Sequence, residues 1–326
     1  MAEYKAIRGH TIRTVAGDPD PLLAGDIWYS STTKKIRGAK LPAGAWSSGG
    51  NLTTGRHDIG GGGIQTAAIA FGGQTLSPTT YHAIAETYDG SSWTEVADLS
   101  QAAAGRTGVG QTQTAMLAVG GYNTPPVGFY AGNESWNGTS WTEIADLNTG
   151  RKTMGGAGTN TAGLIIGGAS STANTAETET WDGSSWTEVG DLNTGRRGEG
   201  SCGATNTAAL CVGGETQPGP GTVNAEIWDG SSWTEVANLN AARDAMGASG
   251  TSTAAIAAGG GPSATAATEE WDNSSWTEVA DLNTARKRFA TSSETSTKAL
   301  VMGNHPGGNP SEEWNQAVTA SSFTSS

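Results

Sequence analysis

Residues that could support catalysis or metal binding are few and scattered along this 326-residue chain. No histidine has the spacing to a second histidine or to a cysteine that a metal site requires. The four histidines are His10, His57, His82 and His305. The two cysteines, Cys202 and Cys211, are interpreted as buried small apolar residues, with a redox pair as the alternative. No G-x-x-x-x-G-K-[ST] phosphate-binding motif is present. We therefore expect no catalytic residue, no metal site and no cofactor.

The ionisable residues that do recur are one arginine and one glutamate in each of several similar segments. Because a buried charge needs a partner, we expect them to satisfy each other and nearby backbone groups. Ligand binding around a rim is the alternative. The arginines are Arg56, Arg151, Arg196, Arg243 and Arg286, and the glutamates are Glu86, Glu134, Glu179, Glu226, Glu269 and Glu312.

These residues belong to an internal repeat with a period of roughly 46 residues. In six units a tryptophan is followed six residues later by a leucine. Inter-unit packing is the expected role of these tryptophans, and a ligand platform is the alternative. They are Trp46, Trp93, Trp141, Trp186, Trp233 and Trp276.

Each unit is predicted to contain four short strands. In the segment 196–239, an apolar run ends at Gly213-Gly214, a Glu-x-Trp strand follows, and an Asp-Gly turn leads to the final strand. Four-stranded units of this length are typical of the blades of an all-β propeller, because one blade alone cannot bury both of its faces.

The order of arginine, apolar strand, double glycine, Glu-x-aromatic and tryptophan resembles the kelch repeat across residues 43–314. The resemblance implies a six-bladed propeller of four-stranded blades. The chain begins with a fourth-strand motif and ends just after a third strand, so we expect residues 43–51 to pair with 312–314 and close the ring. The C-terminal tail, 315–326, is the competing source of that strand. Galactose oxidase is a kelch-type enzyme, but its copper site of two histidines, two tyrosines and a cysteine cannot be assembled from this sequence.

Charge divides the chain into a basic leader and an acidic remainder. Residues 1–42 carry seven Lys/Arg and four Asp/Glu, whereas the rest carries 11 and 27. The overall charge of −13 and the lack of a membrane-length apolar run argue against nucleic-acid binding and membrane insertion. No signal peptide is expected. We predict that the leader, 1–42, is a docking segment; its candidate contact residues are Arg8, Arg13, Trp28, Lys34, Lys35, Arg37 and Lys40.

Residues 25–38, GDIWYSSTTKKIRG, are predicted to form a hairpin and resemble the G-x-I-W-Y-N-S-T segment near the start of bacteriophage fibre and appendage proteins. The whole chain resembles kelch-like virion proteins of marine bacteriophages. This implies a non-enzymatic structural protein of the virion, located at head or tail, whose leader binds other virion proteins. A host glycan- or receptor-binding lectin module is the alternative, a galactose-oxidase-like enzyme is a third hypothesis, and self-association remains open.

Variable loops on one face are the predicted partner-binding surface, because turns on the opposite face are nearly identical between units. Aromatic residues on these loops suit stacking against a sugar or a protein partner, although they could also pack only their own loops. The candidates are Tyr81, His82, Tyr122, Phe129 and Tyr130.

Overall fold

The computed structural model describes residues 12–22, 25–40, 43–123, 128–217, 220–292, 294–316 and 319–322. Their secondary structure is entirely β, so the described part contains no helix that could cross a membrane. The chain divides into a large unit, Ala45–Asn315, and a small unit that combines Met1–Gly44 with Gln316–Ser326.

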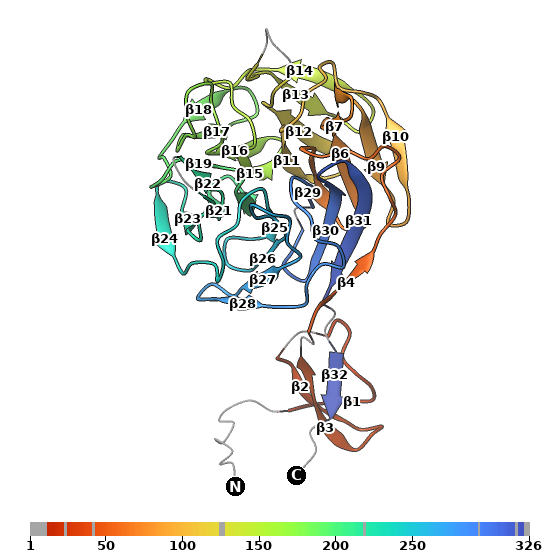
Figure 1. Ribbon diagram of the computed structural model, residues 1–326. Helices are drawn as coiled ribbons and strands as arrows, with labels where there is room; N and C mark the ends of the chain where they lie inside the picture. Colours follow the sequence, from red (N-terminus) through yellow and green to blue (C-terminus); the bar gives the residue numbers. More distant parts are fainter. Residues whose placement is uncertain are drawn as a thin grey trace. The chain divides into compact units, whose positions relative to one another are not determined.

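The large unit contains six four-stranded antiparallel sheets arranged around a common centre (Figure 1). We number them 1 to 6 in chain order. Sheet 1 comprises β5 (Gly60–Ile64), β6 (Ala67–Phe71), β9 (Ala85–Tyr88) and β10 (Trp93–Val96). Sheet 2 comprises β11 (Thr107–Thr112), β12 (Ala115–Val119), β13 (Asn133–Trp136) and β14 (Trp141–Ile144). Sheet 3 comprises β15 (Gly155–Thr159), β16 (Ala162–Ile166), β17 (Thr178–Trp181) and β18 (Trp186–Glu188).

The other three sheets repeat this pattern. Sheet 4 comprises β20 (Gly200–Thr205), β21 (Ala208–Val212), β23 (Ala225–Trp228) and β24 (Trp233–Val236). Sheet 5 comprises β25 (Gly247–Gly250), β26 (Ala255–Ala258), β27 (Thr268–Trp271) and β28 (Trp276–Glu278). Sheet 6 comprises β29 (Ala290–Thr291), β30 (Lys298–Asn304), β31 (Gly308–Asn315) and β4 (Ala45–Ser48). Two small ribbons, β7 (Gln74–Leu76) with β8 (Thr79–Tyr81) and β19 (Arg196–Arg197) with β22 (Glu215–Thr216), lie in the connecting loops.

The outer strand of sheet 6 comes from the other end of the large unit. β4 pairs antiparallel with β31, and Trp46 lies opposite Trp314. This is the pairing that the repeat register predicted between residues 43–51 and 312–314. The competing source, the C-terminal tail, supplies a strand to the small unit instead.

The core of the large unit lies between sheets. Buried residues form six clusters, and each contains side chains from two consecutive sheets, sheets 6 and 1 included. The apolar second strands supply much of this core; Leu164, Ile165 and Ile166 of β16 are all fully buried, for example. An all-β, propeller-like architecture is therefore confirmed.

The small unit is one four-stranded sheet with the order β1 (Arg13–Val15), β2 (Ile27–Ser30), β3 (Lys35–Lys40), β32 (Thr319–Ser322). β2 and β3 form the predicted hairpin, in which Tyr29 lies opposite Ile36. β32 pairs antiparallel with β3. Residues 315–326, expected to be a separate tail, thus contribute a strand to the unit that contains the leader, because β3 offers an edge with unpaired backbone groups.

Candidate binding site

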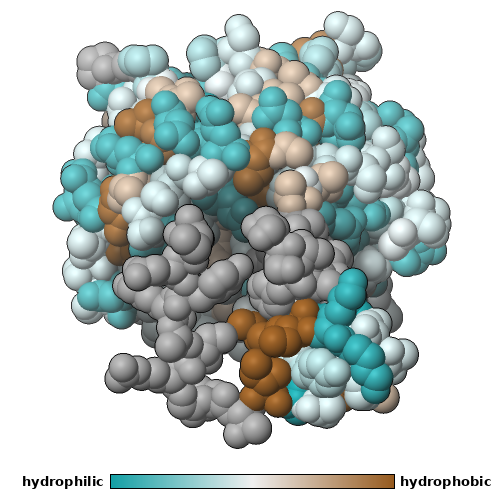
Figure 2. Space-filling model, turned by 90° about the horizontal axis from the view of Figure 1, so that it is seen from below, coloured by the Kyte–Doolittle hydropathy of each residue, from teal (hydrophilic) through white to brown (hydrophobic). Residues whose placement is uncertain are grey.

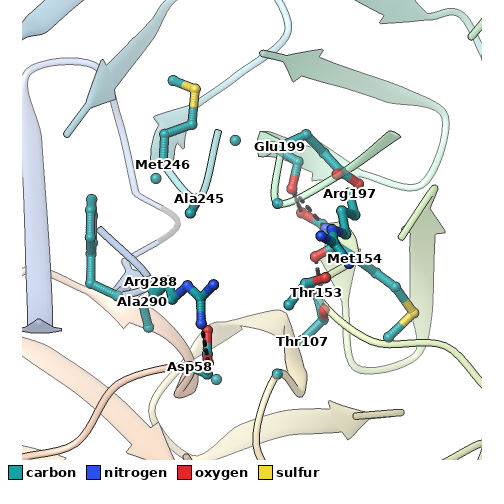
Figure 3. A pocket seen from close by; sticks show the side chains of 18 of the residues that line it. Asp58, Thr107, Thr153, Met154, Arg197, Glu199, Ala245, Met246, Arg288 and Ala290 are labelled. Atoms are coloured by element: carbon teal, nitrogen blue, oxygen red, sulfur yellow. Dashed lines mark hydrogen bonds and ion pairs between the residues drawn. The ribbon is translucent and has the colours of Figure 1, made fainter. Parts of the chain in front are cut away.

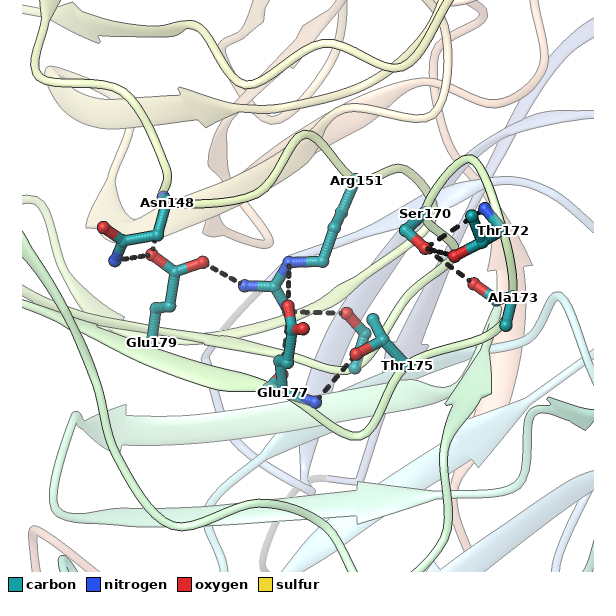
Figure 4. Close-up of polar contacts among 9 residues, drawn as sticks. Asn148, Arg151, Ser170, Thr172, Ala173, Thr175, Glu177 and Glu179 are labelled. Carbon is teal, nitrogen blue, oxygen red and sulfur yellow. Dashed lines mark hydrogen bonds and ion pairs between the residues drawn. The ribbon is translucent and has the colours of Figure 1, made fainter.

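The recurring arginines and glutamates form buried ion pairs. Six pairs occur among the described residues: Arg56–Glu86, Arg106–Glu134, Arg151–Glu179, Arg196–Glu226, Arg243–Glu269 and Arg286–Glu312. Figure 4 shows the pair of sheet 3, where Glu179 also accepts hydrogen bonds from the backbone and side-chain nitrogens of Asn148 at 3.0 and 2.8 Å. The Arg151 guanidinium donates to the carbonyls of Gly167 and Glu177. Each charge thus has internal partners and tethers a connecting loop to its sheet.

The tryptophans of the predicted packing column lie at the inner surfaces between sheets. Five of the six are 6–7 % exposed, and Trp141 is half-buried. Most contact the aromatic residue on the neighbouring strand; Trp228 and Trp233, for example, have ring centroids 5.5 Å apart.

A second column of side chains fills the space beneath the double glycines. Five of its six members follow the loop arginine by three residues and lie close enough to the first glycine of the preceding sheet's pair that a Cβ there would crowd them; the sixth, Arg106, is in ordinary contact with that glycine. The column consists of Ile59, Arg106, Met154, Glu199, Met246 and Phe289. Arg106 is exceptional because it occupies this position and also pairs with Glu134, a role that the loop arginine three residues earlier has in the other sheets. The other charged member of the column is Glu199.

Glu199 is a buried carboxylic acid at a position that is mostly apolar in the other sheets. Its side chain is sandwiched between sheets 3 and 4, and its Oε1 accepts a hydrogen bond of 2.9 Å from the backbone nitrogen of Gly155. Oε2 has no hydrogen-bond partner among the described residues. Burial raises the pKa of Glu199 to about 7, against the weaker opposing effect of hydrogen bonding and nearby Arg196.

Six residues in the left-handed backbone conformation surround the centre of the large unit, and we call them the left-handed ring. The residue that precedes each member of the second column has a positive φ: Asp58 (51°), Gly105 (62°), Thr153 (51°), Gly198 (63°), Ala245 (51°) and Arg288 (57°). Five backbone hydrogen bonds of 2.7–2.9 Å link them in succession from Ala245 through Arg288, Asp58, Gly105 and Thr153 to Gly198. Consecutive sheets are thereby joined at their inner ends.

Because only glycine adopts this conformation without cost, Ala245→Gly is expected to stabilise the protein by about 1 kcal/mol. Urea denaturation measures the change in the free energy of unfolding. Ala237→Gly is the matched control, since Ala237 is exposed and has no positive φ; it should destabilise by roughly 0.5–1 kcal/mol. Equal effects of the two substitutions would contradict the strain assigned to Ala245.

The left-handed ring encloses a pocket of about 340 Å³, shown in Figure 3. Its inner wall consists of small residues from the first strands, including Gly108, Gly156, Gly200 and Ser201. Its mouth contains charged residues of both signs: Asp58, Lys152, Arg197, Glu215, Asp244 and Arg288. We call this cavity the central pocket.

Asp58 organises one side of the mouth. Its Oδ2 accepts hydrogen bonds from Gln74 Nε2 and the Tyr122 hydroxyl, both at 3.0 Å, and lies 3.5 Å from Nη1 of Arg288. Burial, reinforced by the negative charge of Asp58, raises the pKa of Tyr122, so the phenol remains protonated. Across the mouth, Arg197 and Glu215 form a bidentate ion pair with distances of 2.9–3.1 Å.

The predicted partner-binding aromatics are only partly brought together. Tyr81 and Tyr122 meet edge to face with centroids 5.7 Å apart, and the ammonium of Lys152 lies over the rings of Tyr122 and Phe129. Tyr130 instead lies 5.2 Å from the Arg106 guanidinium, and Nε2 of His82 lies 3.5 Å from the Thr75 hydroxyl. All five predicted residues are half-buried. The cluster around Lys152 is therefore the part of this set that borders the pocket.

The predicted docking residues that the structure describes lie in the small unit. Trp28 is not exposed, although a docking residue was expected to be. Trp28 is 1 % exposed, and the Arg37 guanidinium lies 5.9 Å from its ring centroid; its expected direct contact with a partner is therefore corrected to a buried, structural role. Arg13, Lys34 and Lys35 are exposed, and Arg37 forms an ion pair of 2.7 Å with Asp18. Arg8 and the side chain of Lys40 lie outside the described residues.

Neither cysteine forms a disulfide, and burial raises the pKa of each thiol to about 12. Their register places Cys202 opposite Leu210 and Cys211 opposite Ser201, so the two side chains point to opposite faces of sheet 4. No group of three or more His, Cys, Asp or Glu side chains is placed to hold a metal ion within the described ranges.

No family model and no curated protein matches the chain. Many solved structures do match, among them one titled "Structure of YjhT", which is 12 % identical and has a TM-score of 0.65. The similarity covers 83 % of this chain and 96 % of that one. At this identity it shows a shared β-propeller-like fold.

Proposed function

We propose that this chain is a non-enzymatic structural protein of a bacteriophage particle, in which a closed six-bladed kelch-type propeller presents a binding surface and the small unit docks onto the particle. The observation that carries the binding role is the central pocket, whose mouth combines unlike charges with Tyr122 from a variable loop. Residues that recur in every sheet stabilise the sheets, whereas the residues at the mouth of the central pocket differ from one sheet to the next. Such asymmetry is typical of a site selected for a ligand or partner.

Three features support a closed ring of six blades. Core clusters join every consecutive pair of sheets, sheets 6 and 1 included. The left-handed residues are linked by hydrogen bonds across the junction between Arg288 and Asp58. The outer strand of sheet 6, β4, precedes sheet 1 in the chain, so the two ends of the large unit are fastened within one sheet.

The docking role rests on one face of the small sheet. Ile27 and Ile36 are 41 % and 43 % exposed, and the strand register places them on the same face. The basic residues Lys34 and Lys35 lie at the adjoining hairpin. Figure 2 shows hydrophobic residues gathered beside hydrophilic ones at this unit. An apolar patch bordered by cations suits a partner surface with an apolar centre and an acidic rim.

Loss of this unit is expected to abolish incorporation into particles. We expect deletion of either 1–42 or 316–326 to do so, because both segments contribute strands to the small sheet. Mass spectrometry of density-purified particles and gold-labelled antibody would measure the copy number and position of the protein.

Ile36→Asp should reduce incorporation at least tenfold, whereas Leu76→Asp, which alters an equally exposed residue of the large unit, should not. Normal incorporation of Ile36→Asp would overturn the docking face. Absence of the unaltered protein from particles would overturn the virion role.

A host glycan- or receptor-binding lectin is the second candidate function, favoured by the same central pocket. It differs from the structural role because it requires saturable binding of a ligand by the isolated protein. A galactose-oxidase-like enzyme is the third candidate and requires bound copper, which metal analysis of the purified protein detects.

A further inference from the structure

A second cavity lies beside the central pocket, on the variable-loop face. It has a volume of about 190 Å³ and is lined by Phe129, Lys152, residues 169–174, Arg197 and Gln217. Lys152 and Arg197 line both cavities, so they form the wall between them. We call this second cavity the side pocket.

Lys152 has a half-buried ammonium group that forms no ion pair with a described carboxylate, although the negative charge of Asp58 partly offsets the effect of burial on its pKa. Nζ lies 4.1 Å from the ring centroid of Tyr122 and 5.2 Å from that of Phe129. No carboxylate in the described part of the chain lies within 4.0 Å of it, and no described oxygen accepts a hydrogen bond from it. Burial lowers the pKa of Lys152, and the charge of Arg197 adds to this effect. Three N–H donors are therefore held in place by aromatic rings without an acceptor.

The neighbouring cation is already neutralised. Arg197 forms its bidentate pair with Glu215, so it has little capacity left for a ligand anion. The side pocket therefore offers one unpaired positive charge, which matches a monoanion such as a carboxylate better than a phosphate dianion.

The remaining wall of the side pocket is polar. The Nδ2 of Asn174 donates to the carbonyl of Glu215 at 2.7 Å, whereas its Oδ1 is buried without a partner among the described residues. Ser170, Ser171 and Thr172 supply hydroxyl groups, and Phe129 supplies an apolar surface. Hydroxyl groups and an aromatic side chain in one pocket suit a polyhydroxylated ring that forms hydrogen bonds and presents a C–H face.

We propose that the side pocket binds a carboxylated monosaccharide of the uronic acid class, with Lys152 holding the carboxylate and the hydroxyls of residues 170–172 forming hydrogen bonds with those of the sugar. This inference rests on the proposed binding role and gives it a ligand class. It places recognition beside the centre of the ring, between the loops of sheets 2, 3 and 4.

Calorimetric titration of the full-length protein with D-glucuronate and with D-glucose tests the proposal, because these probes differ in the carboxylate alone. Glucuronate should bind about tenfold or more tightly than glucose, and added salt should reduce that preference. Lys152→Met should abolish the preference. Lys287→Met is the matched control: Lys287 occupies the equivalent position in sheet 6, but its ammonium donates to the carbonyl of Pro262.

Equal binding of both sugars, no binding of either, or a preference that survives Lys152→Met would overturn the proposal. Thermal unfolding of each variant shows whether it is folded. Should Lys152→Met not fold, the comparison of the two sugars and its salt dependence in the unaltered protein decide the question. Particle mass spectrometry tests the virion role separately, so failure of one leaves the other standing.

Discussion

Glu199→Gln is expected to remove a loss of stability that the unaltered protein suffers between about pH 5 and pH 8. The folded-state pKa of Glu199 is about 7, above its ordinary value of 4.5, so the folded protein retains this proton over a range in which the unfolded chain releases it. The stabilising contribution is therefore complete below pH 4.5 and is lost as the pH rises through 7. The shift corresponds to roughly 3 kcal/mol.

Glutamine keeps the oxygen that accepts from Gly155 and carries no charge. The variant should match the unaltered protein at pH 4 and exceed it by roughly 3 kcal/mol at pH 9. Urea denaturation at a series of pH values measures both. Burial lowers the pKa of His57, and this effect is common to both proteins, so the difference between the two proteins isolates Glu199. A difference that does not change with pH would show that Glu199 ionises normally.

Arg243→Met is expected to destabilise the large unit by about 3–5 kcal/mol, because it leaves the carboxylate of Glu269 buried without its cation. The substitution also removes the hydrogen bonds that Arg243 donates to the carbonyls of Gly259 and Ala267. Thermal unfolding should show a fall of roughly 10 °C in Tm.

The exposed pair provides the control for this prediction. Arg197→Met breaks the Arg197–Glu215 pair, whose side chains are 32 % and 27 % exposed, and should cost no more than about 1 kcal/mol. Combining Arg243→Met with Glu269→Leu should cost less than the sum of the single substitutions, since the unpaired charge disappears. A cost below about 1 kcal/mol for Arg243→Met would mean that water reaches this pair.

The sheets could be predicted because the repeat displays them six times. The register of the tryptophans even predicted the pairing of β4 with β31, which joins residues 266 positions apart. Alternation of buried and exposed residues, Asp-Gly turns and double glycines carry this information locally, so each unit reinforces the interpretation of the others.

The central pocket was harder to predict because the charged residues at its mouth do not recur in every unit. Lys152, Asp58 and Glu199 each stand within three residues of a loop arginine, but their neighbours across the ring come from other sheets. The detectable signal was a single acid, Glu199, in a column otherwise occupied by apolar residues and one arginine. The β3–β32 pair was missed for a different reason: the C-terminal strand, Thr319–Ser322, has no tryptophan or leucine to reveal its partner.

The small unit is assembled from both ends of the chain, so in topological terms the large unit is an insertion into a host sheet, with its boundaries at residues 44/45 and 315/316. An insertion of this kind is exchangeable. Under the proposed function, replacing residues 45–315 by another propeller would change the bound ligand and keep the docking unit. A cut inside the large unit would leave both halves joined through the small sheet. Under the proposed function, ligand recognition and attachment to the particle would therefore lie in separate segments, which recombination can exchange in a single event.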